Sequence, residues 1–408
     1  MKIVWRLSLA LLMLLPLASI VTAQDIVIGT SAAFKGTSRG LGIELYRGAK
    51  AYLDWINDSG GINGNKIVFK AYDDGYNPVP AIENTIRLVE QDKVFLLMNY
   101  VGTPTVTRVL PLLKKYQSSD VYLFFPFTGA QSQREYPYDA FVFNLRASYR
   151  QETAGLVNHL AESGRRRIAV IYQADSYGRS GWDGVKRALA GLNLKIAGEA
   201  TYRRGSKFTD SMKQQVEIIM RSKPDAVIAV GAYAAVAAFI RDARDSGLTV
   251  PIANLSFVGS ESLVGQLQEA GKANGKDYTA NLINSQVVPS YEDASLPAVK
   301  LYRECMDYYK PALPPGLGEG GYFPLPYSFV SFEGFLNAKL LVEILRKMKN
   351  ADDKKLIRPT VEGIKNLDIG IDAKVSFGPD RHQGLDQVYY TTVSGGKFIP
   401  INWEAWKK

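Results

Sequence analysis

The sequence predicts an α/β protein made of two doubly wound parallel-sheet lobes. Short β-branched or aromatic runs alternate with amphipathic helical stretches through most of the chain, as in a parallel sheet covered by helices on both faces. This alternation occurs twice, once before residue 146 and once after it. At about 150 residues per domain, the 408 residues suffice for two or three domains with a core each.

The first series contains four predicted strands with helices between them. The strands are expected at 25–29, 66–72, 94–98 and 121–125, and the helices near 40–58, 79–91 and 104–117. Gly60 and Gly61 mark the end of the first helix, because glycine enters the left-handed conformation after a helix at little cost.

The second series repeats the same topology. Its helices are expected at 149–163, 177–191, 209–221 and 232–246, and its strands at 167–172, 195–201, 226–230 and 248–252. Further on, an amphipathic helix is expected at 294–309, with Cys305 as a buried small hydrophobe. The many prolines and glycines of 311–326 predict a long loop.

Residues 1–23 have the features of an export signal. Lys2 and Arg6 precede an apolar stretch at 7–20, and Val21-Thr22-Ala23 provides the small residues of a cleavage site. The apolar stretch is shorter than the roughly 20 residues that a membrane span needs. The mature chain is therefore expected to begin at Gln24 and to be located in the periplasm.

Composition excludes several classes of protein. With 46% hydrophobic and 22% charged residues, the chain is neither disordered nor collagen-like. One cysteine and two histidines, His159 and His382, leave little material for a disulfide scaffold, a zinc site or histidine catalysis. No cofactor or metal is expected. The net charge is +9, but the basic runs at 165–167 and 203–204 lack interleaved aromatics, so no nucleic-acid partner is expected.

Two segments match known functional motifs in part, but the residues around them do not fit the corresponding functions. Gly316, Gly318 and Gly321 fit the dinucleotide-binding string, but prolines precede them and no helix follows. The segment 178–181 lacks the spacing of a nucleophile elbow. No catalytic residue is assigned, and a periplasmic enzyme is kept only as a rival hypothesis.

Four loops at the carboxyl ends of predicted strands are the candidate ligand contacts, because open α/β sheets bind ligands there. The segment Gly102-Thr103-Pro104-Thr105 offers amides and hydroxyls at a helix start, which suits a carboxylate. The other three loops supply Phe127, Thr128 and Gly129, then Tyr177, then Tyr233. Ordinary helix capping by the threonines and edge packing by Tyr177 and Tyr233 remain alternatives.

Several short strings of the sequence resemble those of a known protein family. The strings that carry the resemblance are Gly60-Gly61-Ile62-Asn63-Gly64 with its upstream helix, Tyr72-Asp73-Asp74, Asp175-Ser176-Tyr177-Gly178 and Lys207-Phe208-Thr209-Asp210. They resemble the type I periplasmic binding proteins of the leucine/isoleucine/valine-binding family, which serve ABC importers. The resemblance implies two lobes joined by three crossovers, with the ligand held between them.

The resemblance also implies lobe boundaries and partners. Lobe one is expected at 24–145 plus 284–376, and lobe two at 146–283 plus 377–408. A monomer is expected to capture a small solute by hinge closure and to deliver it to an ABC transporter permease. Ligand sensing in a periplasmic signalling system is the alternative role.

In this family, certain positions of lobe one bind the carboxylate of an amino acid ligand. The resemblance implies that the residues at these positions here are Gly102, Thr103, Phe127, Thr128 and Gly129. It also implies that Tyr177 and Tyr233 stand at the positions of lobe two where family members place aromatic side chains.

The chain departs from the family where acidic side chains meet the ligand's ammonium. Those positions correspond to Tyr149 and Ser256, and the nearby charged residues are cations, namely Arg146, Arg150 and Arg39. A buried ammonium without a carboxylate would lack a charge partner. The expected ligand is therefore a carboxylate with an apolar or aromatic body, in preference to a zwitterionic amino acid.

Overall fold

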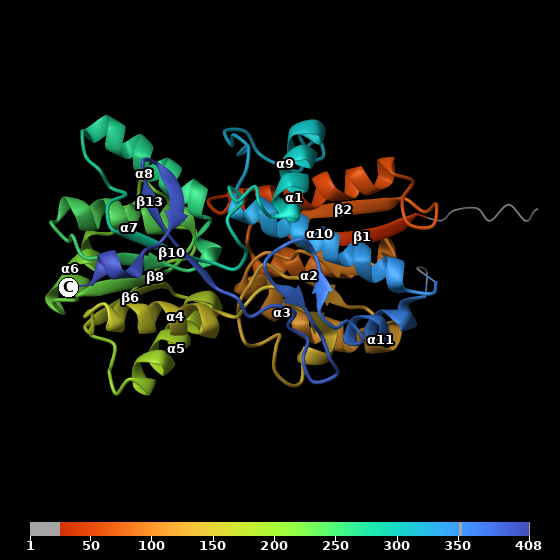
Figure 1. The fold of residues 1–408 in the computed structure, drawn as a ribbon, viewed down its shortest axis with the longest axis horizontal. Coiled ribbons are helices and arrows are strands. Elements are labelled where there is room, and N and C mark those ends of the chain that lie inside the picture. The colour runs from red at the N-terminus through yellow and green to blue at the C-terminus, as the bar shows by residue number, and fades with distance from the viewer. Residues whose placement is uncertain (1–24, 351–352, 408) are drawn as a thin grey trace, which may run out of the picture.

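The computed structural model describes residues 25–350 and 353–407, so the export signal predicted at 1–23 lies outside the described residues. The described chain forms two α/β lobes that lie side by side along the long axis of the molecule (Figure 1). One lobe contains a five-stranded sheet in the order β2-β1-β3-β4-β5, and the other a seven-stranded sheet in the order β14-β13-β10-β9-β8-β6-β7. The predicted fold class is confirmed.

The five-stranded sheet of lobe one is parallel throughout. Its strands are β1 (Ile26–Ala32), β2 (Ile67–Asp73), β3 (Leu96–Met98), β4 (Leu123–Phe124) and β5 (Val142–Phe143). The helices of this lobe are α1 (Arg39–Asp58), α2 (Pro78–Ile86), α3 (Thr103–Lys115), α9 (Pro297–Tyr309), α10 (Phe329–Lys347) and α11 (Ile357–Glu362). A separate antiparallel pair consists of β11 (Leu367–Asp368) and β12 (Lys374–Val375).

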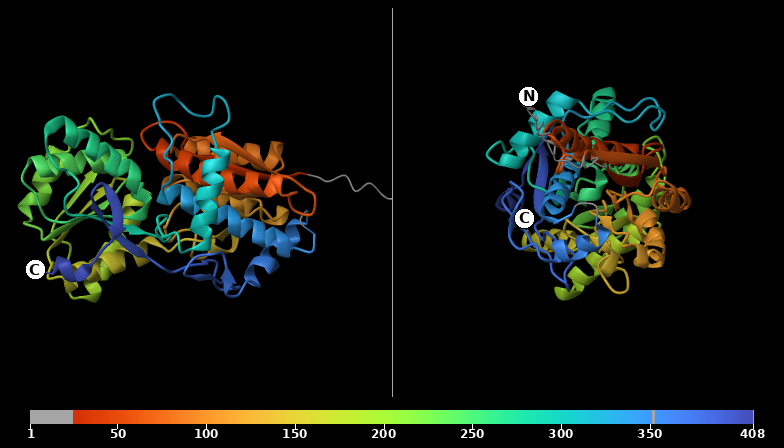
Figure 2. Two further views of the ribbon diagram at one scale, coloured as in Figure 1. Left: turned by 45° about the horizontal axis from the view of Figure 1, so that its top comes forward. Right: turned by 90° about the vertical axis from the view of Figure 1, so that its right-hand side faces the viewer.

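The seven-stranded sheet of lobe two has a parallel centre and an antiparallel edge. Its strands are β6 (Ile168–Gln173), β7 (Glu199–Tyr202), β8 (Ala226–Val230), β9 (Ile252–Asn254), β10 (Leu282–Gln286), β13 (Tyr389–Ser394) and β14 (Lys397–Pro400). Its helices are α4 (Tyr149–Glu162), α5 (Ser176–Gly191), α6 (Lys213–Arg221), α7 (Tyr233–Asp245) and α8 (Ser260–Asn274). The β13–β14 hairpin at the end of the chain thus returns to lobe two (Figure 2).

Shorter elements complete the described chain. A π-helical turn at Arg87–Gln91 follows α2, and 3-10 turns lie at Gln117–Ser119, Asp139–Phe141, Ser256–Val258, Lys354–Leu356 and Trp403–Trp406. None of the helices in the described ranges combines the length and apolar character needed to cross a membrane.

Some predicted element bounds are wrong by several residues. The strand expected at 195–201 begins at Glu199, because its ladder with β6 begins at the pair Val170 and Glu199. The helix expected at 209–221 begins at Lys213, because the preceding residues form a turn in which the Lys207 amide donates to Asp210. The hydrophobic periodicity of the sequence does not show where such turns occur.

The chain passes between the lobes three times, and two of the passages come later than predicted. The boundary expected at 283/284 falls inside β10, whose residues pair with β9 and β13 of the seven-stranded sheet. The boundary expected at 376/377 comes before Phe377, whose ring lies 6.1 Å from that of Phe143 in lobe one. Strand pairing and core packing therefore place both lobe boundaries later in the chain than predicted. No local signal in the sequence marks these positions.

The first and third passages run side by side. The Asn144 amide donates to the His382 carbonyl at 2.7 Å, and the Leu385 amide donates to the Leu145 carbonyl at 2.9 Å. Both segments therefore leave lobe one at one place, which is the geometry of a hinge.

Helices α1 and α10 of lobe one pack with their backbones in close approach. A Cβ atom placed on Gly48 of α1 would lie 1.7 Å from the Ser331 carbonyl oxygen of α10. A Cβ on Gly334 of α10 would lie 2.1 Å from the Leu45 carbonyl oxygen of α1. Glycine is therefore needed at both positions for the helices to approach each other this closely.

We expect the substitution Gly48→Ala to destabilise the protein by about 2 kcal/mol or more, because the added methyl group forces the two helices apart. Thermal unfolding followed by circular dichroism measures the effect. Gly191→Ala is the matched control, since Gly191 also lies in a helix and has no atom within 4 Å of its added Cβ. Equal melting temperatures for the two variants would contradict the packing described here.

Candidate ligand-binding site

The predicted site residues come from the carboxyl ends of parallel strands in both sheets. Thr103 follows β3 and Thr128 follows β4 in lobe one, whereas Tyr177 follows β6 and Ser256 follows β9 in lobe two. Parallel strands direct their carboxyl ends to one edge of a sheet, and here the two edges face each other. The contacts described below show which side chains meet.

On the lobe-one side, two threonine hydroxyls meet at the start of α3. The Thr103 and Thr128 hydroxyls are hydrogen-bonded to each other at 2.7 Å, and both side chains are buried. Gly102 precedes Thr103 with a φ of 96°, and a Cβ here would lie 2.0 Å from the ring of Tyr76. Thr105 is different, because its hydroxyl donates to the Val101 and Gly102 carbonyls within its own helix turn. Hydrogen bonding to the carbonyls of the preceding turn therefore accounts for Thr105.

An aromatic cluster joins the two lobes next to these threonines. The ring centroids of Phe127 and Phe257 lie 5.3 Å apart, and those of Tyr76 and Phe257 lie 5.9 Å apart. On the lobe-two side, Tyr177 lies 4.6 Å from Phe257 and 5.2 Å from Tyr149. All five side chains are buried, so the two lobes are closed on each other in this structure.

Two of these rings carry buried hydroxyls without partners. The Tyr149 and Tyr177 hydroxyl oxygens make no hydrogen bond to any described residue. Burial raises the pKa of Tyr149 to about 12, although the cation of Arg146 acts in the opposite direction. Burial also raises the pKa of Tyr177 well above its ordinary value, so both groups are neutral phenols. A buried hydroxyl without a partner is costly, which is typical of a place that a ligand group completes.

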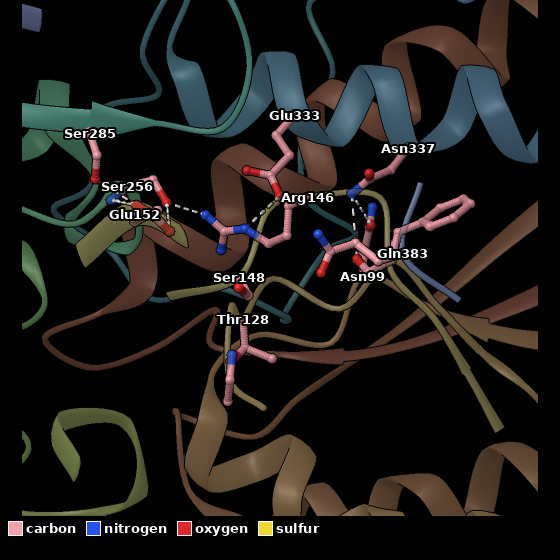
Figure 3. A network of polar contacts seen from close by, with 12 residues as sticks. Asn99, Thr128, Arg146, Ser148, Glu152, Ser256, Ser285, Glu333, Asn337 and Gln383 are labelled. Atoms are coloured by element: carbon pink, nitrogen blue, oxygen red, sulfur yellow. Dashed lines mark hydrogen bonds and ion pairs between the residues drawn. The ribbon is translucent and has the colours of Figure 1, made fainter. Parts of the chain in front are cut away.

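Arg146 lies at the centre of a buried polar network in the first crossover (Figure 3). Its Nε atom is 3.4 Å from Glu333 Oε1 of α10, and its guanidinium donates to the Ser256 hydroxyl of lobe two. The guanidinium carbon also lies 4.6 Å above the ring centroid of Phe127. Arg146 therefore contacts both lobes and one wall of the aromatic cluster.

Ser256 connects Arg146 to a second buried carboxylate. Glu152 of α4 accepts hydrogen bonds from the Ser256 amide at 2.8 Å, the Ser256 hydroxyl at 3.0 Å and the Ser285 hydroxyl at 2.6 Å. Burial by itself lowers the pKa of Arg146, but the carboxylates of Glu333 and Glu152 outweigh burial and raise it. Burial raises the pKa of Glu333 to about 7, against the opposing effect of Arg146. The guanidinium is thus held in its charged form.

Three other predicted contacts lie away from this cluster. Tyr233 and Arg39 line a cavity of about 490 Å³ between the 311–326 loop and α8. The Tyr233 hydroxyl accepts from the Gly40 amide at 3.1 Å, and Arg39 pairs with Glu319 at 2.7 Å. Arg150 pairs with Glu135 at 2.8 Å and with Asp183 at 3.4 Å, and about a third of its side chain is exposed.

The sequence analysis did not identify Tyr76, Phe257, Glu152 and Glu333. Tyr76 and Phe257 follow strands of the two sheets, so the rule that selected Thr103 could have found them. Glu152 and Glu333 are acidic side chains in the interiors of helices, where a solvated face is the ordinary interpretation. The described residues hold no group of three or more His, Cys, Asp or Glu that could bind a metal ion.

The comparison with known proteins identifies the family. A family model described as periplasmic binding protein matches residues 25–397. The chain belongs to the periplasmic binding protein family. This confirms the resemblance found in the sequence, and members of this family are binding proteins.

Solved structures and a curated relative agree with this membership. A possible leucine/isoleucine/valine-binding protein from Rhodopirellula baltica is 30% identical, with a TM-score of 0.84 over 96% of this binding protein and 100% of that chain. A substrate-binding periplasmic protein from Ralstonia solanacearum is 25% identical, with a TM-score of 0.79 over 91% of this chain and 98% of that chain. An amino acid binding protein from Pseudomonas aeruginosa is 27% identical over 64% of this chain and 66% of its own length.

One buried carboxyl group positions the cluster residue Tyr76 of this binding protein. Asp74 accepts from the Tyr76 amide and from the Ser31 hydroxyl, each at 2.8 Å. Burial raises the pKa of Asp74 from 3.8 to about 7, against the effect of these hydrogen bonds. The folded protein therefore binds this proton more tightly than the unfolded chain does, so Asp74 costs stability as pH rises from about 4 to about 7.

We expect the neutral variant Asp74→Asn to remove this pH dependence. The melting temperature of the variant relative to wild type should increase between pH 4 and pH 8, by an amount equivalent to about 1–4 kcal/mol. Thermal unfolding of both proteins across this range is the measurement. A constant difference between them would show that Asp74 is ionised throughout.

Proposed function

We propose that this protein is the substrate-binding component of an ABC importer of the branched-chain amino acid type and captures a small carboxylate-bearing solute between its lobes. The observation that carries the proposal is the set of buried groups without hydrogen-bond partners at the closed interface between the lobes, one terminal nitrogen of Arg146 and the Tyr149 and Tyr177 hydroxyls. Family membership supports a binding role, and the relative from Rhodopirellula baltica is described as a possible leucine/isoleucine/valine-binding protein.

Capture works by hinge closure about the three crossovers. In an open form, the cluster residues of both lobes face water, which satisfies their polar groups. In the closed form those groups lose water, so a solute that supplies acceptors compensates for the loss and shifts the equilibrium towards closure. The ligand therefore acts as the bridge that makes the closed form the stable one.

The remaining parts of the proposal follow from the same role. The protein acts as a monomer in the periplasm after removal of residues 1–23, and an ABC transporter permease recognises the closed form. No side chain is required to break or form a covalent bond, so the protein is not an enzyme.

The first experiment identifies the solute and tests closure. Mass spectrometry of solute released from the purified protein gives the ligand's identity, and the solute-free protein is then prepared by unfolding, dialysis and refolding. Small-angle X-ray scattering should show a smaller radius of gyration when the identified solute is added back. An unchanged radius with a bound solute would refute hinge closure, and a chemically altered solute would favour an enzyme.

We expect Thr128→Val to weaken binding of that solute about tenfold, because the variant removes a buried hydroxyl beside the aromatic cluster. Isothermal titration calorimetry measures the affinity. Thr107→Val is the matched control on α3, since the Thr107 hydroxyl donates to the Thr103 carbonyl of its own helix at 2.6 Å. Equal losses in the two variants would exclude Thr128 from the site.

A further inference from the structure

Arg146 has more donors than the protein uses. Its side chain is 1% exposed, and its hydrogen bond to Ser256 employs one terminal nitrogen. The other terminal nitrogen and Nε make no hydrogen bond to the described residues, although Nε faces Glu333 at ion-pair distance. The free terminal nitrogen and the second N–H of the nitrogen that donates to Ser256 form the end of the guanidinium, which is an edge that can bind a carboxylate in two-pronged fashion.

The carboxylates near Arg146 are already occupied. Glu152 accepts three hydrogen bonds, from Ser256 and Ser285, and Glu333 is directed at Arg146 itself. An ammonium group placed beside Arg146 would therefore meet a cation, with neither of these carboxylates free to neutralise it.

Two further acidic side chains near the cluster are also committed. Asp74 accepts from the Tyr76 amide and the Ser31 hydroxyl, and Asp175 accepts from the Tyr177 amide at 3.0 Å and from the Gln173 side chain at 2.6 Å. Asp175 lies 3.6 Å from Arg204 as well. The charged carboxylates near Arg146 are thus committed, and N–H and O–H donors beside aromatic rings remain for a ligand.

We infer that Arg146 binds the carboxylate of the ligand and that the ligand carries no ammonium group next to it. This inference rests on the proposed function and narrows it to one class of solute, a non-amino carboxylic acid with a planar aromatic body. The donors are the Arg146 guanidinium and the two tyrosine hydroxyls, and the rings of Phe127, Tyr177 and Phe257 enclose the body.

The spacing of the rings supports an aromatic body. Phe127 holds the Arg146 guanidinium carbon 4.6 Å from its ring centroid, and Phe257 links Phe127 to Tyr177 through centroid distances of 5.3 and 4.6 Å. These are the distances at which aromatic groups attract each other in tilted or stacked pairs. In this closed form the rings touch one another, so a planar ligand ring would enter between the walls when the lobes open and would replace these ring–ring contacts with its own.

The test uses solute-free wild-type protein and two pairs of compounds that differ in the amino group alone. The pairs are 3-phenylpropionate with L-phenylalanine, and 4-methylpentanoate with L-leucine, each titrated by calorimetry. We expect 3-phenylpropionate to bind at least about 30-fold more tightly than L-phenylalanine, and more tightly than 4-methylpentanoate. An amino acid that binds as tightly as its deaminated partner, or more tightly, would overturn the inference and leave the proposed function standing.

Variants of Arg146 test its role directly. Arg146→Met should weaken the binding of 3-phenylpropionate about 30-fold or more. Its affinity for the uncharged 3-phenylpropanamide should stay within about threefold of the wild-type affinity. Arg146→Lys keeps the positive charge but not the planar guanidinium, so it should lose less affinity for 3-phenylpropionate than Arg146→Met does. Arg150→Met is the matched control, because Glu135 and Asp183 already engage Arg150 outside the cluster. Equal affinity of Arg146→Met and wild type for the acid would refute the assignment.

Two further outcomes are decisive. If Arg146→Met does not fold because Glu333 loses its partner, the double variant Arg146→Met/Glu333→Gln removes both charges and is measured instead. If neither pair of compounds binds, the solute released from the purified protein decides: one with an ammonium beside its carboxylate overturns the inference, and an acid without one supports it. Failure of every carboxylate to bind would refute the proposed function as well.

Discussion

The buried guanidinium of Arg146 is the constraint on which the closed arrangement of the lobes depends. A cation removed from water is costly unless it is paired and hydrogen-bonded. Arg146 obtains a carboxylate from lobe one, through Glu333, and a hydroxyl from lobe two, through Ser256. Because the two partners come from different lobes, this one side chain couples the hinge, the interface and the place where a ligand would bind.

The network around Arg146 also explains why the site presents donors. Glu152 is satisfied by Ser256 and Ser285 within lobe two, so its charge serves to hold Ser256 in position. The unused hydrogen-bonding capacity beside the aromatic cluster includes one end of the guanidinium and two phenols. A solved structure described as a possible leucine/isoleucine/valine-binding protein shares the fold, and a shared fold by itself does not fix the solute that a chain binds.

The architecture supplies the remaining requirement, which is relative motion. Both sheets present the carboxyl ends of parallel strands to the same interface, so short loops from each lobe meet there. The first and third crossovers are hydrogen-bonded to each other at Asn144 and Leu145, so they run together between the lobes. The proposed hinge closure would therefore leave the core of each lobe packed.

The sequence by itself determined the fold class and the carboxyl-end loops that carry Thr103, Thr128 and Tyr177, because periodicity and glycine stops are local properties. Only the tertiary structure decided that Arg146 is buried at the interface while Arg150 pairs on the surface, and that Glu333 and Phe257 belong to the same cluster. It also moved the lobe boundaries beyond β10 and Phe377. The reason is physical: burial and strand pairing join residues that are far apart in the chain, and no local pattern encodes which distant partner a side chain will meet.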